Sequence, residues 1–147
     1  GNENAYSLHK ELGELMTDNV TVVRYNKKLE ETDQKLQELM ERYQNINIID
    51  TAKWSNQAVS FTRQLGGMLS LARVITIGAL LRNESRGAHY KPEFPERDDE
   101  NFLKTTMAKY NPEKNGPDIY YEDVDISLIP PRKRDYTKKK GEGAAKK

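Results

Sequence analysis

The chain has 147 residues, which suits one domain built around a single core. Charged residues make up 32% of it, yet the formal net charge is only +1, so a general polyanion binder is excluded because long-range attraction needs a net field. There is no cysteine and there are only two histidines, which excludes disulfides, thiolate metal ligands and cysteine nucleophiles and leaves little room for a histidine-rich metal site. The N-terminus, GNENAYSLHKELGEL, has neither a signal pattern nor a starting methionine, and we expect a processed chain or an excised fragment.

Two amphipathic helices are predicted in the first 47 residues. The first has Ser7 placed as its N-cap and ends near Asp18-Asn19. The second runs from Asn26 to Asn47; its apolar stripe is narrow, and its other faces are expected to lie in water. Between them the β-branched stretch VTVVRY, residues 20–25, fits either a strand or a buried connection. The two apolar stripes consist of Leu8, Leu12, Leu15 and Met16, and of Leu29, Leu36, Leu39, Met40 and Tyr43.

A third helix is predicted from Asn56 to about Asn83, and it is apolar on nearly every face. A helix of this kind is surrounded by protein or by lipid. Arg63, Arg73 and Arg82 interrupt the windows of about 20 residues that a membrane span would need. We therefore expect this helix to pack on the first two helices on one side and on something outside this chain on the other.

Three glycines in this third helix, Gly66, Gly67 and Gly78, each cost about 1 kcal/mol of helix propensity relative to alanine. Close approach of another backbone would offset that cost, and a local kink at Gly66-Gly67 is the alternative. An uncovered apolar helix that carries glycines also favours a homodimer of the isolated chain.

All six prolines fall in the last two-fifths of the chain, where they limit regular helix. The stretch DIYYEDVDISLI alternates between apolar and acidic residues and predicts one or two short strands that lie along a larger body. The final PPRKRDYTKKKGEGAAKK has eight basic residues against two acidic ones and indicates a disordered tail. Only Tyr136 could stack on bases there, so the signal for nucleic acid or anionic lipid is weak. The predicted fold class is mainly α: a three-helix bundle, spectrin-repeat-like, at 1–90, an extended segment with short strands at 91–136, and a disordered basic tail at 137–147.

The stretch ESRGAHYKPEFPERDD, Glu84 to Asp99, is dense in charge and holds two prolines. His89 with its acidic neighbours lacks the paired spacing of a metal site, and the two arginines give those carboxylates another use. A Ser85/His89 nucleophile would need an orienting acid and an oxyanion hole that one sequence does not show. The glycines of LGGML sit inside an apolar helix and so lack the context of a phosphate loop.

What remains for this stretch is recognition of polypeptide. Guanidinium groups form planar two-point hydrogen bonds with carboxylates, and around rigid prolines such groups need specific partners. The alternative is that four of these charges pair with each other and only finish the long helix. We expect docking through Glu84, Ser85, Arg86, Gly87, His89, Arg97, Asp98 and Asp99.

The order LHKELGELMTDNVTVVR and then RQLGGMLSLARVITIGALLRNESRGAHYKPEFPERDDENFLK resembles the C-terminal region of the succinate dehydrogenase flavoprotein subunit. That family is shared with fumarate reductase and, more distantly, L-aspartate oxidase. The resemblance covers about residues 3–136, and ESRGAH followed by FPERDD is its specific element. The chain departs from the family pattern at Lys91, Glu93, Phe102 and Thr105.

The resemblance implies a helical C-terminal domain whose extended segment packs along a flavin-binding body. In this family the residues that hold FAD and act on the dicarboxylate precede this region, so no catalytic, cofactor-binding or metal residue is assigned here. The parent would oxidise succinate to fumarate by hydride transfer to FAD, and this part alone would be inactive.

The expected partners are the FAD-binding and capping domains of the same subunit and, in addition, the iron-sulfur subunit. Nucleic acid is not expected, and membrane contact is indirect, through a complex at the cytoplasmic face of the bacterial inner membrane. The alternative function is an independent helical adaptor whose exposed apolar helix recruits a partner.

Overall fold

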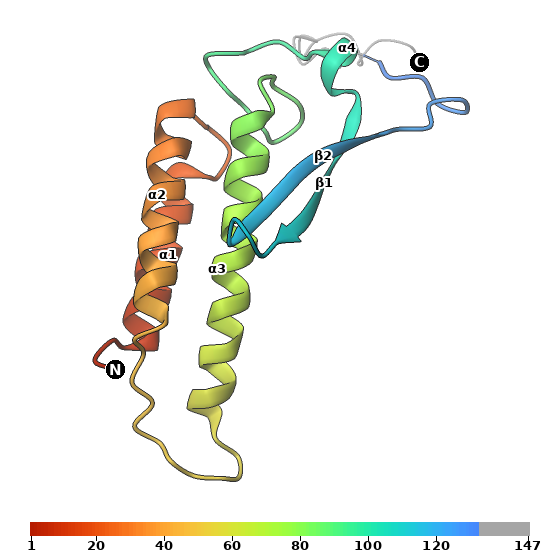
Figure 1. The fold of residues 1–147 in the computed structure, drawn as a ribbon. Helices are drawn as coiled ribbons and strands as arrows, with labels where there is room; N and C mark the ends of the chain where they lie inside the picture. Colours follow the sequence, from red (N-terminus) through yellow and green to blue (C-terminus); the bar gives the residue numbers. More distant parts are fainter. Residues whose placement is uncertain (133–147) are drawn as a thin grey trace, which may run out of the picture.

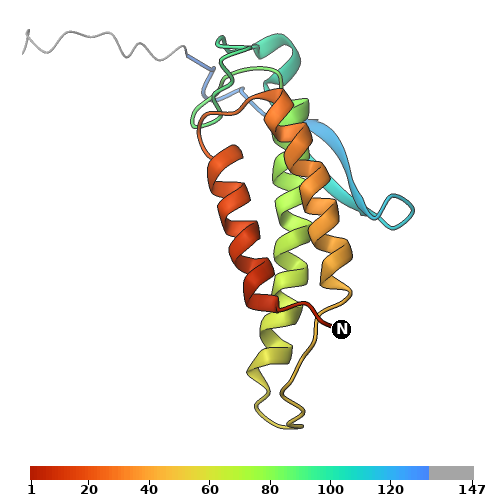
Figure 2. The ribbon, with the colours of Figure 1, turned by 90° about the vertical axis from the view of Figure 1, so that its left-hand side faces the viewer.

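The computed structural model describes residues 1–132 and confirms the mainly α fold (Figure 1). Three long helices form a bundle and a β-hairpin lies beside it. The elements in chain order are α1 (Ala5–Asn19), α2 (Asn26–Tyr43), α3 (Gln57–Leu81), α4 (Asp99–Phe102), β1 (Lys104–Asn111) and β2 (Gly116–Asp123). Helices α1, α2 and α3 run up, down and up in the bundle (Figures 1 and 2). The basic tail predicted at 137–147 lies outside the described residues.

The N-terminus of α1 is capped by Asn4, so the prediction that Ser7 caps this helix is wrong. The Asn4 Oδ1 accepts hydrogen bonds from the backbone N–H groups of Tyr6 (2.9 Å) and Ser7 (3.2 Å). Asn4 has the extended backbone that a cap requires, with φ of −104°, while Ser7 already lies inside the first turn. An asparagine three residues upstream is as good a cap as serine, and only backbone geometry separates the two.

Helix α2 ends at Tyr43, before the predicted Asn47, because the chain then pairs with the N-terminal segment. Glu3 forms a parallel bridge with Ile46, in which Glu3 N–H donates to the Asn45 carbonyl at 3.0 Å. The connector at 20–25 is a buried connection at its start and carries one further bridge, between Val23 and Tyr90. It is therefore not a strand of a sheet.

The core lies between the three long helices along the predicted stripes. Each fully buried leucine contributes about 1.5–3 kcal/mol relative to an exposed one. The leucines of this core with at most 6% exposure are Leu8, Leu12, Leu36, Leu39, Leu65 and Leu69. Helix α3 supplies the central side of this core, as its apolar composition predicts.

Helix α3 is, among the described residues, the one helix long and apolar enough by composition to cross a membrane. A packed core helix passes the same test, and α3 packs on both α1 and α2. Its Arg73 is 8% exposed and pairs with Asp33 of α2, with Nε to Oδ1 at 2.8 Å. The other two helices of the bundle therefore cover α3 on one side only.

The glycines of α3 have different environments. A Cβ on Gly66 would come within 2.7 Å of the Tyr43 hydroxyl, so the close neighbour there is a side chain of α2 and the expected backbone approach is wrong. A Cβ on Gly67 would meet nothing, and one on Gly78 would make ordinary contact with Thr106 at 3.6 Å. The helix runs unbroken through Gly66-Gly67.

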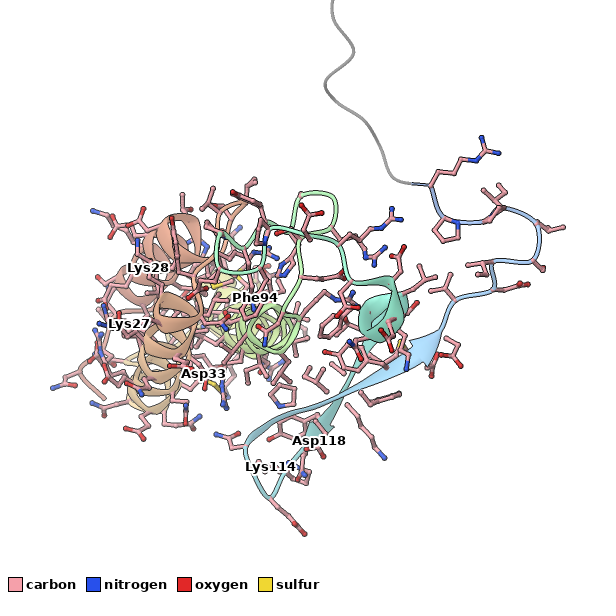
Figure 3. The ribbon with its side chains drawn as sticks, turned by 90° about the horizontal axis from the view of Figure 1, so that it is seen from above. Lys27, Lys28, Asp33, Phe94, Lys114 and Asp118 are labelled. Atoms are coloured by element: carbon pink, nitrogen blue, oxygen red, sulfur yellow. The ribbon has the colours of Figure 1, made fainter. Side chains whose placement is uncertain are left out.

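The β-hairpin pairs β1 and β2 antiparallel, from Lys104 opposite Asp123 to Asn111 opposite Gly116. β2 covers the first half of the stretch in which strands were predicted, whereas β1 was not predicted. Seen along the helices, the hairpin lies beside α3, with Lys114 and Asp118 near its turn (Figure 3). Hairpin strands contact α3 and so cover part of its outer side.

Candidate docking site

The end of α3 is organised around Glu84, which is fully buried. Its carboxylate accepts hydrogen bonds from Arg82 Nη1 (2.6 Å), from Arg86 Nε (2.9 Å) and Nη2 (3.0 Å), and from the Asp98 backbone N–H (3.0 Å). Burial raises the pKa of a carboxyl, but the hydrogen bonds from Arg86, Asp98 and Arg82 outweigh it and hold the pKa of Glu84 below its usual value. Glu84 is therefore a buried anion matched by two cations.

Arg82 extends this network to α4 and the hairpin. Its guanidinium donates to the carbonyls of Phe102 (2.8 Å) and Lys104 (2.7 Å) and to the Thr106 hydroxyl (2.9 Å). It also lies over the Tyr121 ring, with Cζ 5.6 Å from the ring centre. Sequence reasoning treated Arg82 only as an obstacle to a membrane span. The sequence signal for its role as a partner of Glu84 was its position, directly after an apolar helix and two residues before Glu84.

The second half of the charged stretch is also paired internally. Asp99 accepts from Arg86 Nη2 and from Arg97 Nη2, each at 2.7 Å, and these bonds hold its pKa below the usual value. Asp98 caps the short helix α4 through its side chain. Arg97 also donates to the Arg132 carbonyl at 3.0 Å. The structure thus brings Glu84 and these four charged residues of the predicted docking set into one network. The alternative was that Glu84, Arg86, Arg97 and Asp98 pair with each other; the structure differs in that the Asp99 carboxylate, and not that of Asp98, binds the arginines.

The three remaining predicted residues shape the backbone of the loop. Gly87 has φ of 61° and occupies a tight turn in which Arg86 and His89 exchange backbone hydrogen bonds. The Ser85 hydroxyl donates to the Phe94 carbonyl at 2.7 Å and accepts from the Lys91 N–H at 3.0 Å, so its partners are backbone groups rather than His89. His89 lies between the connector that follows α1 and the end of α3.

Lys91 closes the C-terminus of α3. Its side chain is fully buried, and its Nζ donates to the Leu80 carbonyl (2.8 Å) and to Asn83 Oδ1 (3.0 Å). A cation there also interacts favourably with the negative end of the helix dipole. Burial lowers the pKa of Lys91 to about 8. Sequence reasoning recognised this residue only as a departure from a family pattern.

The uncovered side of α3 carries an exposed apolar stripe. Met68, Leu71 and Ile75 stand at helical spacing, and their exposed fractions are 38%, 63% and 50%. An apolar cavity of about 210 Å³ opens next to this stripe, between α3 and the hairpin. Its apolar lining includes Met40, Leu71, Val74, Ala108, Tyr110 and Pro117. Because the hairpin was only half predicted, sequence reasoning missed this cavity.

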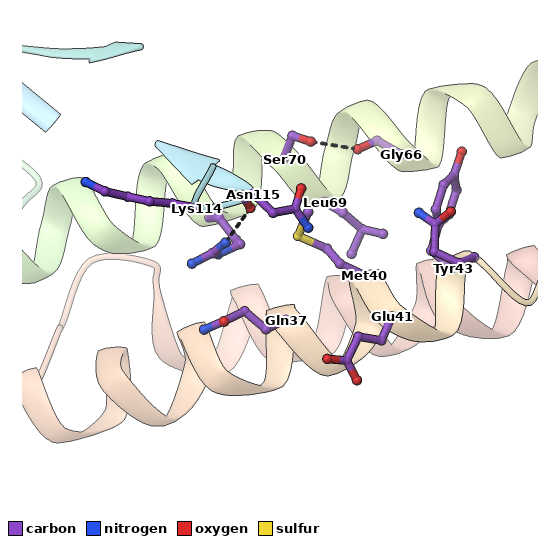
Figure 4. A pocket seen from close by; sticks show the side chains of 11 residues that line it. Gln37, Met40, Glu41, Tyr43, Gly66, Leu69, Ser70, Lys114 and Asn115 are labelled. Atoms are coloured by element: carbon purple, nitrogen blue, oxygen red, sulfur yellow. Dashed lines mark hydrogen bonds between the residues drawn. The ribbon is translucent and has the colours of Figure 1, made fainter. Parts of the chain in front are cut away.

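A second, polar cavity of about 400 Å³ lies between α2, α3 and the hairpin turn (Figure 4). Arg73 lines it and donates to Asp33 and, at 2.8 Å, to the Asn115 carbonyl. The Ser70 hydroxyl donates to the Gly66 carbonyl within the helix. Arg73 is therefore already engaged in holding α2, α3 and the hairpin turn together. Within residues 1–132, no group of three histidine, aspartate or glutamate side chains is placed to hold a metal ion.

This sequence and this fold match known proteins. A family model described as "Fumarate reductase flavoprotein C-term" matches residues 9–136. The succinate dehydrogenase flavoprotein subunit of Bacillus subtilis is 68% identical over 140 residues, which are 95% of this chain and 24% of that protein. The fumarate reductase flavoprotein subunit of Helicobacter pylori is 41% identical over 142 residues, which are 95% of this chain and 20% of that protein.

A solved chain of the E. coli quinol fumarate reductase has the same fold. It aligns with a TM-score of 0.86 and 36% identity over 90% of this chain and 23% of its own length. This chain thus spans about a quarter or less of these relatives. The agreement of family model, sequence and fold shows that the chain belongs to the family of succinate dehydrogenase and fumarate reductase flavoprotein subunits and matches their C-terminal domain.

Proposed function

We propose that this chain is the structural C-terminal domain of an FAD-dependent flavoprotein subunit that oxidises succinate to fumarate. Its relatives are named as flavoprotein subunits of succinate dehydrogenase and fumarate reductase, and most of their length lies outside the region matched here. The domain would hold the flavin-binding and capping domains in their working arrangement. Alone it would not turn over substrate.

The observation that carries this proposal is the exposed apolar stripe of α3 beside the apolar cavity. Leu71, in the middle of this stripe, is 63% exposed. Contiguous apolar surface of this kind marks an interaction site in soluble domains. The flavin-binding and capping domains of the same subunit are the occupants that family membership provides.

The charged stretch Glu84–Asp99 has a supporting role in this proposal. Glu84 and Asp99 already accept from Arg86 and Arg97 of the same stretch, so these two arginines have few free donor groups left for a partner. We propose that the eight predicted docking residues fix the relative positions of α3, α4 and the hairpin. They thereby shape the rim of the docking surface, and the exposed parts of the Arg86 and Arg97 side chains, 28% and 26%, contact the larger body.

The described residues do not fit a flavin. Dinucleotides bind at the carboxyl ends of a parallel sheet, where a glycine-rich turn leads into a helix. Within residues 1–132 the sheet consists of two antiparallel strands, so the described part of the chain has no parallel sheet with such a turn. We therefore assign FAD, and the chemistry on succinate, to the rest of the subunit.

Further partners follow from the same family membership. One solved relative is titled as a quinol-fumarate reductase with menaquinol molecules, at 35% identity. We propose that the parent of this chain works in such a complex at the cytoplasmic face of the bacterial inner membrane. In that complex the iron-sulfur subunit would be a neighbour, and this domain would contact the membrane only through the complex.

A complementation assay tests the proposal. The chain is mixed with the matching flavoprotein truncated before this region, and complex formation is followed together with dye-linked succinate oxidation. We expect association and restored activity with the wild-type chain. Leu71→Lys should weaken association at least about tenfold, because a lysine replaces a buried apolar contact of about 1.5–3 kcal/mol. Ile49→Lys is the matched control, since Ile49 is 85% exposed but lies in the α2–α3 loop.

Arg86→Ala and Arg97→Ala separate the two parts of the surface. If they weaken association as strongly as Leu71→Lys does, the charged stretch itself makes the main docking contacts. If both pieces are folded but no complex forms with the wild-type chain, the structural role is wrong. The independent adaptor then becomes the function to pursue.

A further inference from the structure

His89 joins two segments that lie 65 residues apart in the chain. Its Nδ1 is 2.7 Å from Arg24 Nη1, and its Nε2 is 2.9 Å from the Arg82 carbonyl oxygen. Arg24 belongs to the connector between α1 and α2, and Arg82 caps the end of α3. The imidazole therefore bridges the connector and the charged loop.

The two partners fix the protonation state of this ring. A guanidinium can only donate hydrogen bonds and a carbonyl can only accept them. His89 must therefore accept at Nδ1 and donate from Nε2, which is the neutral ring with its proton on Nε2. A second proton would sit on Nδ1 and face the N–H of Arg24 at a heavy-atom distance of 2.7 Å. Protonation thus replaces a hydrogen bond by two opposed donors that both carry positive charge.

The charges that surround His89 all have the same sign as that added proton. Arg24 comes from the connector, Arg82 from the end of α3 and Lys91 from the charged loop. Burial lowers the pKa of His89, and these three cations lower it further against the opposing effect of the Arg82 carbonyl.

The neighbouring carboxylates are engaged elsewhere. Glu84 accepts from Arg82 and Arg86, and Glu93 accepts from the backbone N–H of Asn26 at 2.8 Å. Among the described residues, the charged groups that act on His89 are the three cations Arg24, Arg82 and Lys91. Nothing in its surroundings therefore compensates an imidazolium.

A backbone bridge joins the same two segments beside the imidazole. Arg24 N–H donates to the Tyr90 carbonyl at 2.9 Å, and Tyr90 N–H donates to the Val22 carbonyl at 3.1 Å. Arg24 is also held by the Val20 carbonyl at the end of α1, through Nε at 3.2 Å and Nη2 at 3.0 Å. When a protonated His89 repels Arg24, the arginine can keep its two bonds to the Val20 carbonyl and move away from the loop together with the connector.

We propose that His89 is a proton-operated latch. The neutral ring holds the connector, residues 20–25, on the loop at 86–90, and protonation in mild acid releases it. This device goes beyond the proposed docking role and does not depend on it, because both halves of the latch lie within this chain.

Hydrogen exchange of the full 147-residue chain tests the latch. The amides of Arg24 and Tyr90 are followed by NMR from about pH 7.5 to about pH 5, relative to their intrinsic exchange rates. We expect their relative exchange to rise by up to about tenfold per pH unit below the usual pKa of imidazole, since one proton is linked to opening. His89→Asn keeps an acceptor near the Nδ1 position but does not titrate, so its profile should be flat. His9→Asn is the control, because His9 is exposed on α1 and should leave the wild-type response unchanged.

Three results would overturn the latch. One is a flat wild-type profile, another is a His89→Asn profile as steep as that of the wild type, and the third is a ring-nitrogen spectrum with the proton on Nδ1 at about pH 7.5. If His89→Asn does not fold, the wild-type ring-nitrogen titration decides. The ring must then protonate over the same pH range in which the Arg24 and Tyr90 amides open.

Discussion

At the scale of single residues, Glu84 is the most constrained anion of the described chain. Removing one partner of a buried ion pair leaves an uncompensated charge and costs about 3–5 kcal/mol. Glu84→Gln keeps the shape but leaves Arg82 and Arg86 without their common anion, so we expect a loss of that size in urea unfolding. Glu14→Gln is the control, because the Lys10–Glu14 pair is exposed at 3.8 Å, and it should cost less than about 1 kcal/mol. Equal losses in the two variants would contradict this account.

The pH dependence of Glu84 follows from the same contacts. Its folded-state pKa lies below the ordinary value, so the unfolded chain binds more protons in acid. The stability that Glu84 contributes is present above its ordinary pKa and is lost as the pH falls through the lower, folded-state pKa. In Glu84→Gln the free energy of unfolding should therefore fall less steeply as the pH is lowered into the acid range, as measured by unfolding at a series of pH values.

Lys91 gives a pH dependence of the same sign on the alkaline side. Burial lowers its folded-state pKa to about 8, from 10.5, so between these values the unfolded chain binds the additional proton. The free energy of unfolding should therefore rise with pH in that window, by at most about 1.4 kcal/mol per pH unit. Lys91→Met should remove the rise whatever its effect at neutral pH. Lys10→Met, on the exposed face of α1, should leave the rise in place, and a rise that persists in Lys91→Met would show that another group causes it.

At the scale of elements, Arg73 joins α2, α3 and the hairpin turn. It pairs with Asp33 and donates to the Asn115 carbonyl, and Gly116 packs so closely on it that a Cβ there would lie 2.7 Å from Nη1. Arg73→Met should cost about 3 kcal/mol or more, because Asp33 is left half-buried without its cation. Amide exchange should then accelerate first in β1 and β2, whereas Arg63→Met, on the exposed side of α3, should change neither. Uniform acceleration across all helices would show that Arg73 does not act on the hairpin.

The elements also show what the sequence could predict. The first two helices followed from leucine stripes with a repeat near 3.6 residues, and the third followed from a long run that is apolar on nearly every face. β1 was missed because KTTMAKYN has no alternation of apolar and polar residues, and it is a strand only through pairing with β2 beside α3. The site was predicted as a set of charges, but their mutual pairing was left as one of two alternatives. The bonds from Arg82 to β1 and from Lys91 to the end of α3 depend on tertiary contacts that no local spacing shows.

At the scale of the whole molecule, the chain is a bundle with one uncovered apolar side. Met68, Leu71 and Ile75 stand on that side and are exposed to water in this chain. We expect the isolated chain to associate with itself through this stripe, because burying each of these side chains contributes about 1.5–3 kcal/mol. Light scattering after size exclusion should show a mass that rises with protein concentration. Ile75→Lys should raise the concentration at which half of the chains are associated by at least about tenfold.

The control for this prediction is again Ile49→Lys, which changes an equally apolar residue far from the stripe. It should leave the concentration dependence unchanged, because exposure alone does not make an interface and contiguity does. If both variants remain associated, the contact lies elsewhere on the chain. If the wild type stays monomeric at high concentration, the stripe is too small to bind a second copy. The proposed docking on the rest of the subunit would then require shape complementarity as well as apolar area.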